Sequence, residues 1–390
     1  MIRFVAENNP VHRVNERVRT RLVAAQNEML ESVFSDAKAF CEAVFDDLRI
    51  SVTAPNSLAG APPSFVSDQP FPHLIEYFTT LLQAASVDEH SARIHAANLA
   101  QRTHLVRAFP DPDEAVGFVT EKVRTIVQRF PKRASDIERG RNPGDVLDPY
   151  ILAATQMLLY GGDFQGAIGA TVAHKALMII EGLMGHLHEE VIGHMRGNVR
   201  APEPKKEEID VEDNPFPGAD VVQPPRKDGD GMRFHQIKSK TGSAKGGDGR
   251  RLGEQLRRLR LYYGGEVFYD ALIGNTLRGH RSMRGVLTAE PRTVVLVGEA
   301  AFEELTNSSI GPELLLRVYT GAFSNVARQE GYHINTMAEG IVTTFQARAD
   351  TAGDDFLDQL LSKSIRSNRD EQDSRVYQPP TRGSRSARRK

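Results

Sequence analysis

Apolar residues recur at helical spacing through most of the first 196 residues. Apolar positions three and four apart predict a helix over 11–48, two shorter helices over 70–107, and another over 114–130 that ends at Phe130-Pro131. A Gly-rich break after DPYILAATQMLLY precedes one long apolar helix that ends near residue 195. The first half of the chain is therefore predicted to be mainly α-helical.

The pattern changes at about residue 197. The segment 197–217 is rich in proline and acidic residues, so we expect a linker-like loop there. Strands are predicted where short apolar runs follow, at 219–223, 233–240, 267–273 and 293–297. The last run is continuous and β-branched, which predicts a buried central strand. Further helices are predicted at 251–263, 300–306, 312–328, 332–348 and 354–364, the later ones packing on this sheet.

This order of elements predicts an α/β (α+β) fold in which helices flank a mixed sheet. We expect a mainly α-helical N-terminal region over 1–145 and a second domain over 146–364 that contains the sheet. A basic tail over 365–390 has too few apolar residues to fold.

Composition restricts the class of protein. The single cysteine, Cys41, excludes a disulfide framework and a multi-cysteine zinc site. No apolar run approaches the roughly 18 residues of a membrane helix, and the first residues lack a signal-peptide core. We therefore expect a cytoplasmic protein with no membrane role.

The net charge of −2 hides an uneven distribution. Residues 226–284 contain 14 Lys and Arg against six Asp and Glu, and residues 363–390 contain nine against three. Two basic segments in a nearly neutral chain suggest a polyanionic partner.

The segment 218–254 places polar side chains at one point. Asp220 opens a short apolar strand, a turn centred on 227–231 follows, and the next strand has Phe234, Gln236, Lys238 and Lys240 on one face because side chains alternate. A hairpin about this turn would set Asp220 opposite Gln236 or Lys238. A carboxylate and neighbouring oxygens suit Mg²⁺, which polarises a phosphate and activates a bound water, and a lysine beside them can orient that water or stabilise developing charge. The grouping favours phosphodiester hydrolysis.

These residues resemble the PD-(D/E)xK nuclease superfamily. Asp220, 15 intervening residues and Gln236-Ile237-Lys238 are similar to its signature, with Gln in place of the second acid as in Mrr-like nucleases. A second alignment is similar to the Kx13E arrangement of some type II restriction endonucleases, because 13 residues separate Lys240 from Glu254, although Lys238 stands where a serine is expected. The two alignments assign the catalytic role to different lysines, and both stay open.

The resemblance implies a restriction-endonuclease-like domain that cleaves double-stranded DNA at specific sites with Mg²⁺, by attack of a metal-activated water. Asp220 and either Gln236 or Glu254 would hold the metal, with Glu181 of the preceding helix as an auxiliary acid, and Lys238 or Lys240 would position the water. Cutting both strands of a palindrome is simplest for a homodimer, and the N-terminal helices would serve dimerisation or clamp the DNA.

Basic residues around this segment are candidates for DNA contact. The Gly-rich loop after the second strand and the helix after it contribute Lys245, Arg250 and Arg251. A later segment contributes Asn275, Arg278, Arg281 and Arg284, residue types that read base edges or bind phosphates.

Two other functions compete with the nuclease. One is a non-catalytic nucleic-acid-binding protein that uses the same basic surface. The other is a metallohydrolase centred on His186, Glu190 and His194, which share one helix face. No nucleotide cofactor is expected, because Asp248 stands where a phosphate-binding loop that began at Gly242 would need lysine.

Overall fold

The computed structural model describes residues 16–138, 147–201, 216–227, 230–240, 248–274, 277–330 and 334–364. The chain divides into two compact units. The sheet unit comprises Met1–Thr125 and Glu181–Gly331, and the helical unit comprises Ile126–Ile180 and Tyr332–Lys390. This division differs from the boundary expected near residue 145, because the N-terminal helices belong to the same unit as the sheet.

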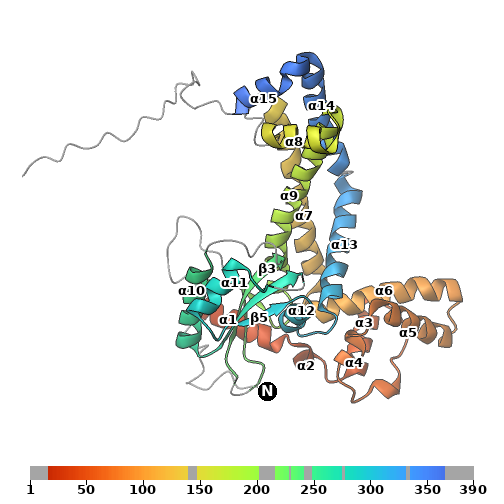
Figure 1. Ribbon diagram of the computed structural model, residues 1–390. Helices are drawn as coiled ribbons and strands as arrows, with labels where there is room; N and C mark the ends of the chain where they lie inside the picture. The colour runs from red at the N-terminus through yellow and green to blue at the C-terminus, as the bar shows by residue number, and fades with distance from the viewer. Residues whose placement is uncertain are drawn as a thin grey trace, which may run out of the picture. The chain divides into compact units, whose positions relative to one another are not determined.

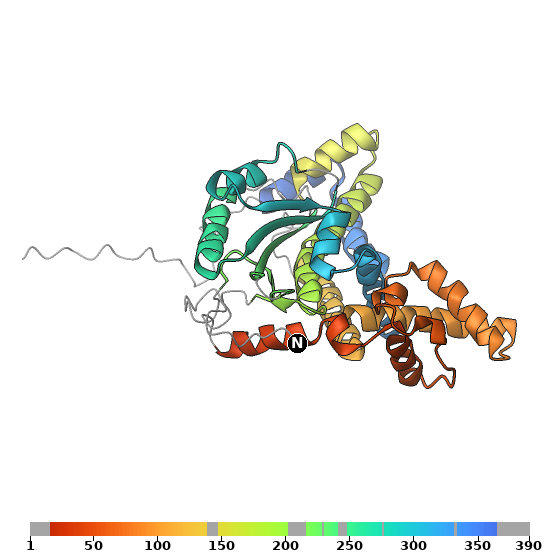
Figure 2. The same ribbon diagram turned by 90° about the horizontal axis from the view of Figure 1, so that it is seen from below.

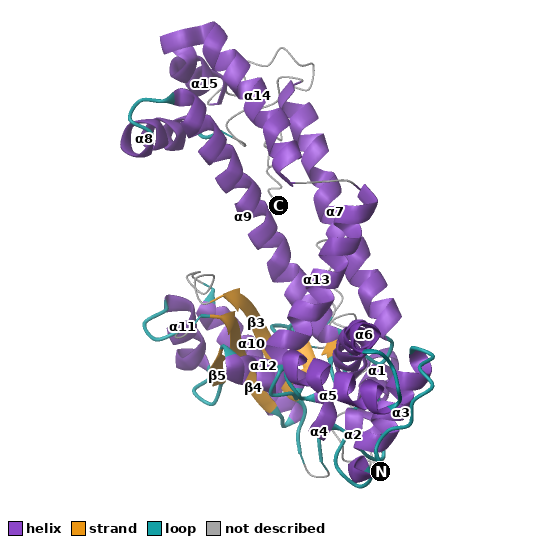
Figure 3. Cartoon of the chain, turned by 90° about the vertical axis from the view of Figure 1, so that its right-hand side faces the viewer, coloured by secondary structure: helices purple, strands orange, loops and turns teal. Residues whose placement is uncertain are grey.

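The described part of the sheet unit contains one mixed sheet of five strands (Figure 3). Its strands are adjacent in chain order: β1 (Val199–Arg200), β2 (Val221–Gln223), β3 (Arg233–Lys240), β4 (Glu266–Ile273) and β5 (Val294–Val297). The pairs β1–β2 and β2–β3 are antiparallel, whereas β3–β4 and β4–β5 are parallel. The structure therefore has the α/β class that the sequence predicted.

Two details of the sheet differ from the predictions. The β-branched run at β5 lies at an edge of the sheet, and β3 is the central strand. β5 is covered by α12 (Glu299–Thr306), and Val294 remains 38% exposed. The short strand β1 lies in the segment expected to be a loop, because two residues give no alternation to detect and only pairing with β2 defines them.

Helices α10 (Gly249–Tyr263) and α11 (Arg281–Ala289) lie on one side of the sheet, and α12 lies on the other (Figure 2). The predicted apolar stripe of α10 is confirmed, because Leu256, Leu259 and Tyr263 are buried against Phe234 of β3. Gly264 ends α10 with φ of 74°, a left-handed conformation that suits glycine. Helix α11 was not predicted, since its segment was interpreted only as a candidate for DNA contact.

The N-terminal part of the sheet unit is helical. In place of the single helix expected over 11–48, the described residues form α1 (Glu16–Asn27), α2 (Leu30–Val33) and α3 (Ala37–Asp47). The break before α3 has a local cause, because the Asp36 side chain accepts a hydrogen bond from Ala39 N at 2.8 Å and so caps the new helix. The elements η2 (Asn56–Leu58), α4 (Ser64–Ser67), α5 (Phe71–Ala84) and α6 (Glu89–Ala108) follow, and the last two confirm the pair predicted over 70–107.

Helix α7 (Pro112–Glu138) passes through Pro131, so the end predicted at Phe130 is wrong. Proline lacks an N–H, which removes one hydrogen bond from the helix but does not prevent it from continuing. The long apolar helix is confirmed as α9 (Phe164–Gly193), and α13 (Gly311–Glu330) completes the sheet unit.

The helical unit contains α8 (Pro149–Leu159), α14 (Ile334–Ala352), η5 (Gly353–Asp355), α15 (Phe356–Ser364) and the adjoining parts of α7 and α9 (Figure 1). Its core includes Leu152, Ile168, Phe345 and Phe356. The sequence predicted that α14 and α15 pack on the sheet, whereas the structure assigns them to the unit that does not contain it. Across the described residues of both units, no helix has the length and apolar character needed to cross a membrane.

Candidate active site

The β2–β3 hairpin brings Asp220 and Gln236 together. Val221 pairs with His235, so Asp220 lies opposite Gln236, and Asp220 N donates to His235 O at 2.7 Å. The carboxylate oxygen Oδ2 of Asp220 accepts hydrogen bonds from Ile237 N at 2.7 Å and from Gln236 Nε2. Of the two positions expected opposite Asp220, the structure selects Gln236.

Oxygen atoms converge on the Gln236 amide. Its Nε2 lies within hydrogen-bonding distance of Asp220 Oδ2 and at 3.4 Å from Ile237 O, so a carboxylate and a main-chain carbonyl face the same point. Mg²⁺ prefers oxygen ligands and commonly uses one or two carboxylates together with waters and substrate phosphates. A Gln236 amide turned to present Oε1 would add a third oxygen, so these residues fit Mg²⁺. Within the described part of the chain, no group of three or more His, Cys, Asp or Glu side chains gathers as a metal site.

The two candidate lysines differ in their partners. Lys240 Nζ forms an ion pair at 2.8 Å with Glu181 Oε2 of α9. The side chain of Lys238 is half-buried and forms no hydrogen bond or ion pair with any residue that the structure describes. Lys238 is two residues from Gln236 on the same face of β3, so its ammonium group is within reach of a ligand bound at Asp220.

Arg200 connects α9 to the hairpin. Its Nη1 donates to Asp220 O at 2.6 Å, and its Nη2 donates to Glu189 Oε2 at 3.0 Å. Gly193 gives the arginine room, because a Cβ there would lie 2.7 Å from Arg200 Cβ. Sequence reasoning missed Arg200 and Glu189, since Arg200 lies in the segment expected to be a loop.

Glu254 is not joined to this group. It lies on the exposed face of α10 and pairs with Arg250 at 3.4 Å. No hydrogen bond or ion pair connects it to Asp220 or Gln236 among the described residues. The structure thus brings together the residues of the first alignment, and it pairs both members of the second, Lys240 and Glu254, with other residues.

Exposed arginines surround the N-terminal ends of α10 and α11. These helices pack closely because Gly249 and Gly253 face the backbone of α11, where a Cβ would lie 2.1 Å from Ser282 O and 2.6 Å from Val286 O. Gly285 faces the backbone of α10 in return. The arginines of this cluster are Arg250, Arg251, Arg278, Arg281 and Arg284. Helix α10 follows β3 and α11 follows β4, and these two strands are parallel. The arginines therefore lie beyond the carboxyl ends of the strands, where Lys240 also lies.

Not every polar residue of this region belongs to the arginine cluster. Ser282, which lies among these arginines, is buried and bonds Tyr269 at 3.0 Å, so its hydroxyl supports the core. Lys245 and Asn275 lie outside the described residues.

No family model matches the chain, and no curated protein matches it. A functional assignment therefore depends on the arrangement of Asp220, Gln236 and Lys238 and on the arginine cluster.

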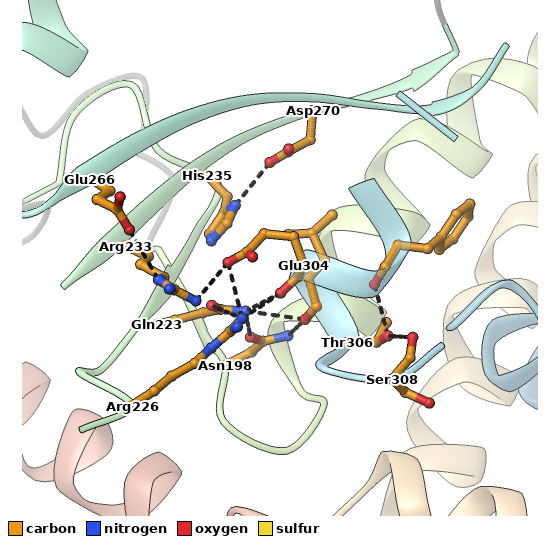
Figure 4. A network of polar contacts seen from close by, with 12 residues as sticks. Asn198, Gln223, Arg226, Arg233, His235, Glu266, Asp270, Glu304, Thr306 and Ser308 are labelled. Atoms are coloured by element: carbon orange, nitrogen blue, oxygen red, sulfur yellow. Dashed lines mark hydrogen bonds and ion pairs between the residues drawn. The ribbon is translucent and has the colours of Figure 1, made fainter. Parts of the chain in front are cut away.

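A buried polar network fixes the strands that hold the site (Figure 4). His235 Nδ1 bonds Asp270 Oδ2 at 2.9 Å, and both side chains are fully buried. Burial raises the pKa of Asp270, and the hydrogen bond from His235 opposes this effect. Glu304 of α12 pairs with Arg226 at 3.0 Å and with Arg233 at 2.9 Å. These contacts join β3 to β4 and to α12. The sequence alone did not reveal them, because the partners are 35 to 78 residues apart in the chain.

The histidine stripe of α9 does not form a metal site. Glu190 pairs with Arg200 at 3.6 Å, and His194 Nδ1 lies 2.6 Å from Glu190 O of its own helix and stacks near Phe118. His186 faces Glu189 at 4.0 Å. Each of the three residues therefore contacts a different protein group, and the three side chains do not converge on one point.

Proposed function

We propose that the chain is a Mg²⁺-dependent endonuclease that cleaves double-stranded DNA at specific sites, of the type II restriction class. The observation that supports this most strongly is the meeting of Asp220 with Gln236 across the β2–β3 hairpin, with Lys238 next on the same face. This set combines a carboxylate, an amide and a lysine ammonium group, a combination that suits metal-assisted phosphodiester hydrolysis.

The order of elements also supports the proposal. Helix α9 precedes three antiparallel strands, and α10 then crosses over to the parallel strand β4. The resemblance to PD-(D/E)xK nucleases implies this sequence of helix, hairpin, amphipathic helix and further strand. The finer assignment to a restriction-endonuclease-like fold is part of the proposal.

Each residue has a distinct role in the proposed reaction. Asp220 and Gln236, with the Ile237 carbonyl, would hold Mg²⁺, which supplies positive charge that polarises the phosphate and makes a water more acidic. Lys238 donates hydrogen bonds that orient the attacking water and stabilise negative charge on the phosphate. The water oxygen bonds to phosphorus and releases a proton to solvent, the bond between phosphorus and the 3′ oxygen breaks, and that oxygen takes a proton from solvent, which leaves a 5′-phosphate and a 3′-hydroxyl. Arg200 holds the Asp220 backbone, and Glu181 holds Lys240.

The arginine cluster supports a nucleic-acid substrate. Five exposed guanidinium groups beyond the sheet edge that bears the lysines would bind successive phosphates or guanine edges. In this proposal a backbone bound there would run past Lys238 and bring a phosphate near Asp220.

An Asp220→Asn variant tests the proposal. We expect cleavage in Mg²⁺ to fall at least about 1000-fold, while DNA binding in a gel shift is retained, because the arginines are unchanged. Asp248→Asn is the matched control, since it makes the same change on an exposed residue at the start of α10 and should keep activity. Cleavage by Asp220→Asn at the wild-type rate would contradict the assignment.

One observation favours a second candidate, a non-catalytic nucleic-acid-binding protein. Asp220 is the single carboxylate that meets Gln236 among the described residues, whereas Glu181 and Glu254 pair with basic residues. This candidate predicts a gel shift with the wild-type protein and no metal-dependent cleavage of any DNA.

A further inference from the structure

Helix α8 has an apolar face that no described residue covers. Its 11 residues, PYILAATQMLL, include no charged side chain. Leu152 and Gln156 point into the helical unit, where α8 packs against α15. The opposite side is open: Tyr150 is 69% exposed, Ile151 52%, Met157 68% and Leu158 81%.

The exposed positions form a continuous stripe. Residues 150, 151, 154, 157 and 158 recur three and four apart, which is the spacing of one helix face. Leu159 at the end of the helix is 75% exposed, and Leu177 and Met178 of α9 expose more apolar surface in the same unit. Contiguous apolar surface of this kind marks an interaction site.

We propose that this face is the contact between two copies of the chain, with α8 of one copy packed against α8 of the other about a two-fold axis. A two-fold contact sets a surface against itself, so it requires a surface without unbalanced charge. The α8 stripe meets this requirement because it has no charged residue. The inference rests on the proposed function in one respect: cutting two DNA strands requires two sites, and each chain has one Asp220.

The chemistry of the face disfavours other occupants. A helix that lies on a membrane has Lys and Arg on its polar side, whereas α8 has none and is flanked by Asp148 and Asp163, which anionic headgroups would repel. The chain's own residues 365–390 offer only Ile365, Val376 and Tyr377 as large apolar groups, and 139–146 offer only Val146. Neither segment matches the length of the apolar stripe.

The oligomeric state of the full chain, measured without DNA by light scattering after size exclusion, tests the inference. We expect the mass of two chains for wild type at micromolar concentration. Leu158→Glu would place a charge in the apolar contact and should raise the dissociation constant at least about 100-fold. Ile94→Glu on α6, where the wild-type residue is 51% exposed, is the matched control and should stay dimeric. A wild-type monomer, or a Leu158→Glu variant that stays dimeric, would overturn the inference.

Cross-linking gives a second readout that does not depend on how Leu158→Glu folds. Ala154 lies in the middle of the stripe, so Ala154→Cys should form a covalent dimer with a short bis-maleimide. The native Cys41 gives a low background, because burial raises the pKa of its thiol to about 12. A dimer that Ala154→Cys cannot cross-link would place the contact elsewhere and overturn the inference. Neither readout depends on DNA, so a monomer that cleaves DNA would reject the interface and retain the nuclease.

Discussion

Lys238 and Lys240 are the same residue type, two positions apart on one face of β3, yet their surroundings differ. Glu181 neutralises Lys240 at 2.8 Å, whereas Lys238 has no charged partner among the described residues and lies next to Gln236. An ammonium group without a partner can donate its hydrogen bonds to a ligand. The structure therefore distinguishes two lysines that the sequence alone leaves equivalent.

Alanine substitution of each lysine tests this distinction. We expect Lys238→Ala to lower kcat for DNA cleavage by about 100-fold or more, because it removes the group that orients the water and stabilises charge. Lys240→Ala should lower kcat less than about tenfold, since it breaks an exposed ion pair. Single-turnover rates in Mg²⁺ provide the comparison. The reverse order of effects would favour the alignment through Lys240 and Glu254.

His188 makes the stability of the sheet unit depend on pH. Its Nδ1 lies 2.9 Å from the Tyr319 hydroxyl, and burial lowers the pKa of His188 from 6.5 to about 4. The unfolded chain therefore binds a proton between pH 6.5 and 4 that the folded chain does not, so stability falls as pH decreases through this window. The expected contribution is about 3 kcal/mol.

A His188→Gln variant keeps a polar partner for Tyr319 and removes the titration. Urea unfolding at pH 7 and pH 4 should show that wild type loses about 3 kcal/mol more than the variant. Equal losses in the two proteins would show that His188 does not cause the pH dependence.

Local patterns along the chain predicted the elements with regular spacing. β3 and α10 were predicted from alternation and from the stripe of Leu252, Leu256, Leu259 and Tyr263, which are properties of short segments. Other features depend on distant partners. Strand β1 is defined only by its pairing with β2, and α11 packs on glycines of α10. Arg200 contacts Glu189 and Asp220 only in the folded chain.

The residues of the candidate site likewise fall into those that local spacing predicts and those that depend on distant partners. Asp220, Gln236 and Lys238 were found because a hairpin relates them by simple counting. The buried pair of His235 and Asp270 and the ion pairs of Glu304 could not be found, because nothing local specifies which strand lies next to β3. Glu254 shows the converse, since the folded chain pairs it locally with Arg250 at i−4, and no contact among the described residues joins it to Asp220 or Gln236.

The close contact between helices α10 and α11 positions the arginine cluster. The Gly253→Ala variant tests whether this contact is needed. The added Cβ would lie 2.6 Å from Val286 O and 2.9 Å from Ala289 Cβ, so the helices must separate. We expect a loss of about 1–3 kcal/mol in the free energy of unfolding, together with weaker DNA binding. Thermal unfolding and gel shifts measure the two effects.

Gly321→Ala in α13 is the matched control. Nothing lies within 4 Å of a Cβ at Gly321, so alanine should raise stability by about 0.5–1 kcal/mol through its higher helix propensity. If Gly253→Ala were also stabilising, the close α10–α11 contact would not hold the arginines.

At the scale of the whole molecule, the two units concentrate different chemistry. The sheet unit contains the Asp220 group and the arginine cluster, although the chain as a whole has a net charge of −2. The helical unit contains the uncharged face of α8. We infer that one unit cuts DNA and that the other joins two copies.

The product pattern on DNA shows most directly whether the protein is a Mg²⁺-dependent endonuclease. Purified wild-type protein would be incubated with unmethylated bacteriophage DNA in Mg²⁺ or in EDTA, with Asp220→Asn in parallel. We predict discrete fragments with 5′-phosphate ends in Mg²⁺, and intact DNA both in EDTA and with the variant. Intact DNA in every lane, on several DNAs that the wild-type protein still binds, would contradict the claim and favour a nucleic-acid-binding protein.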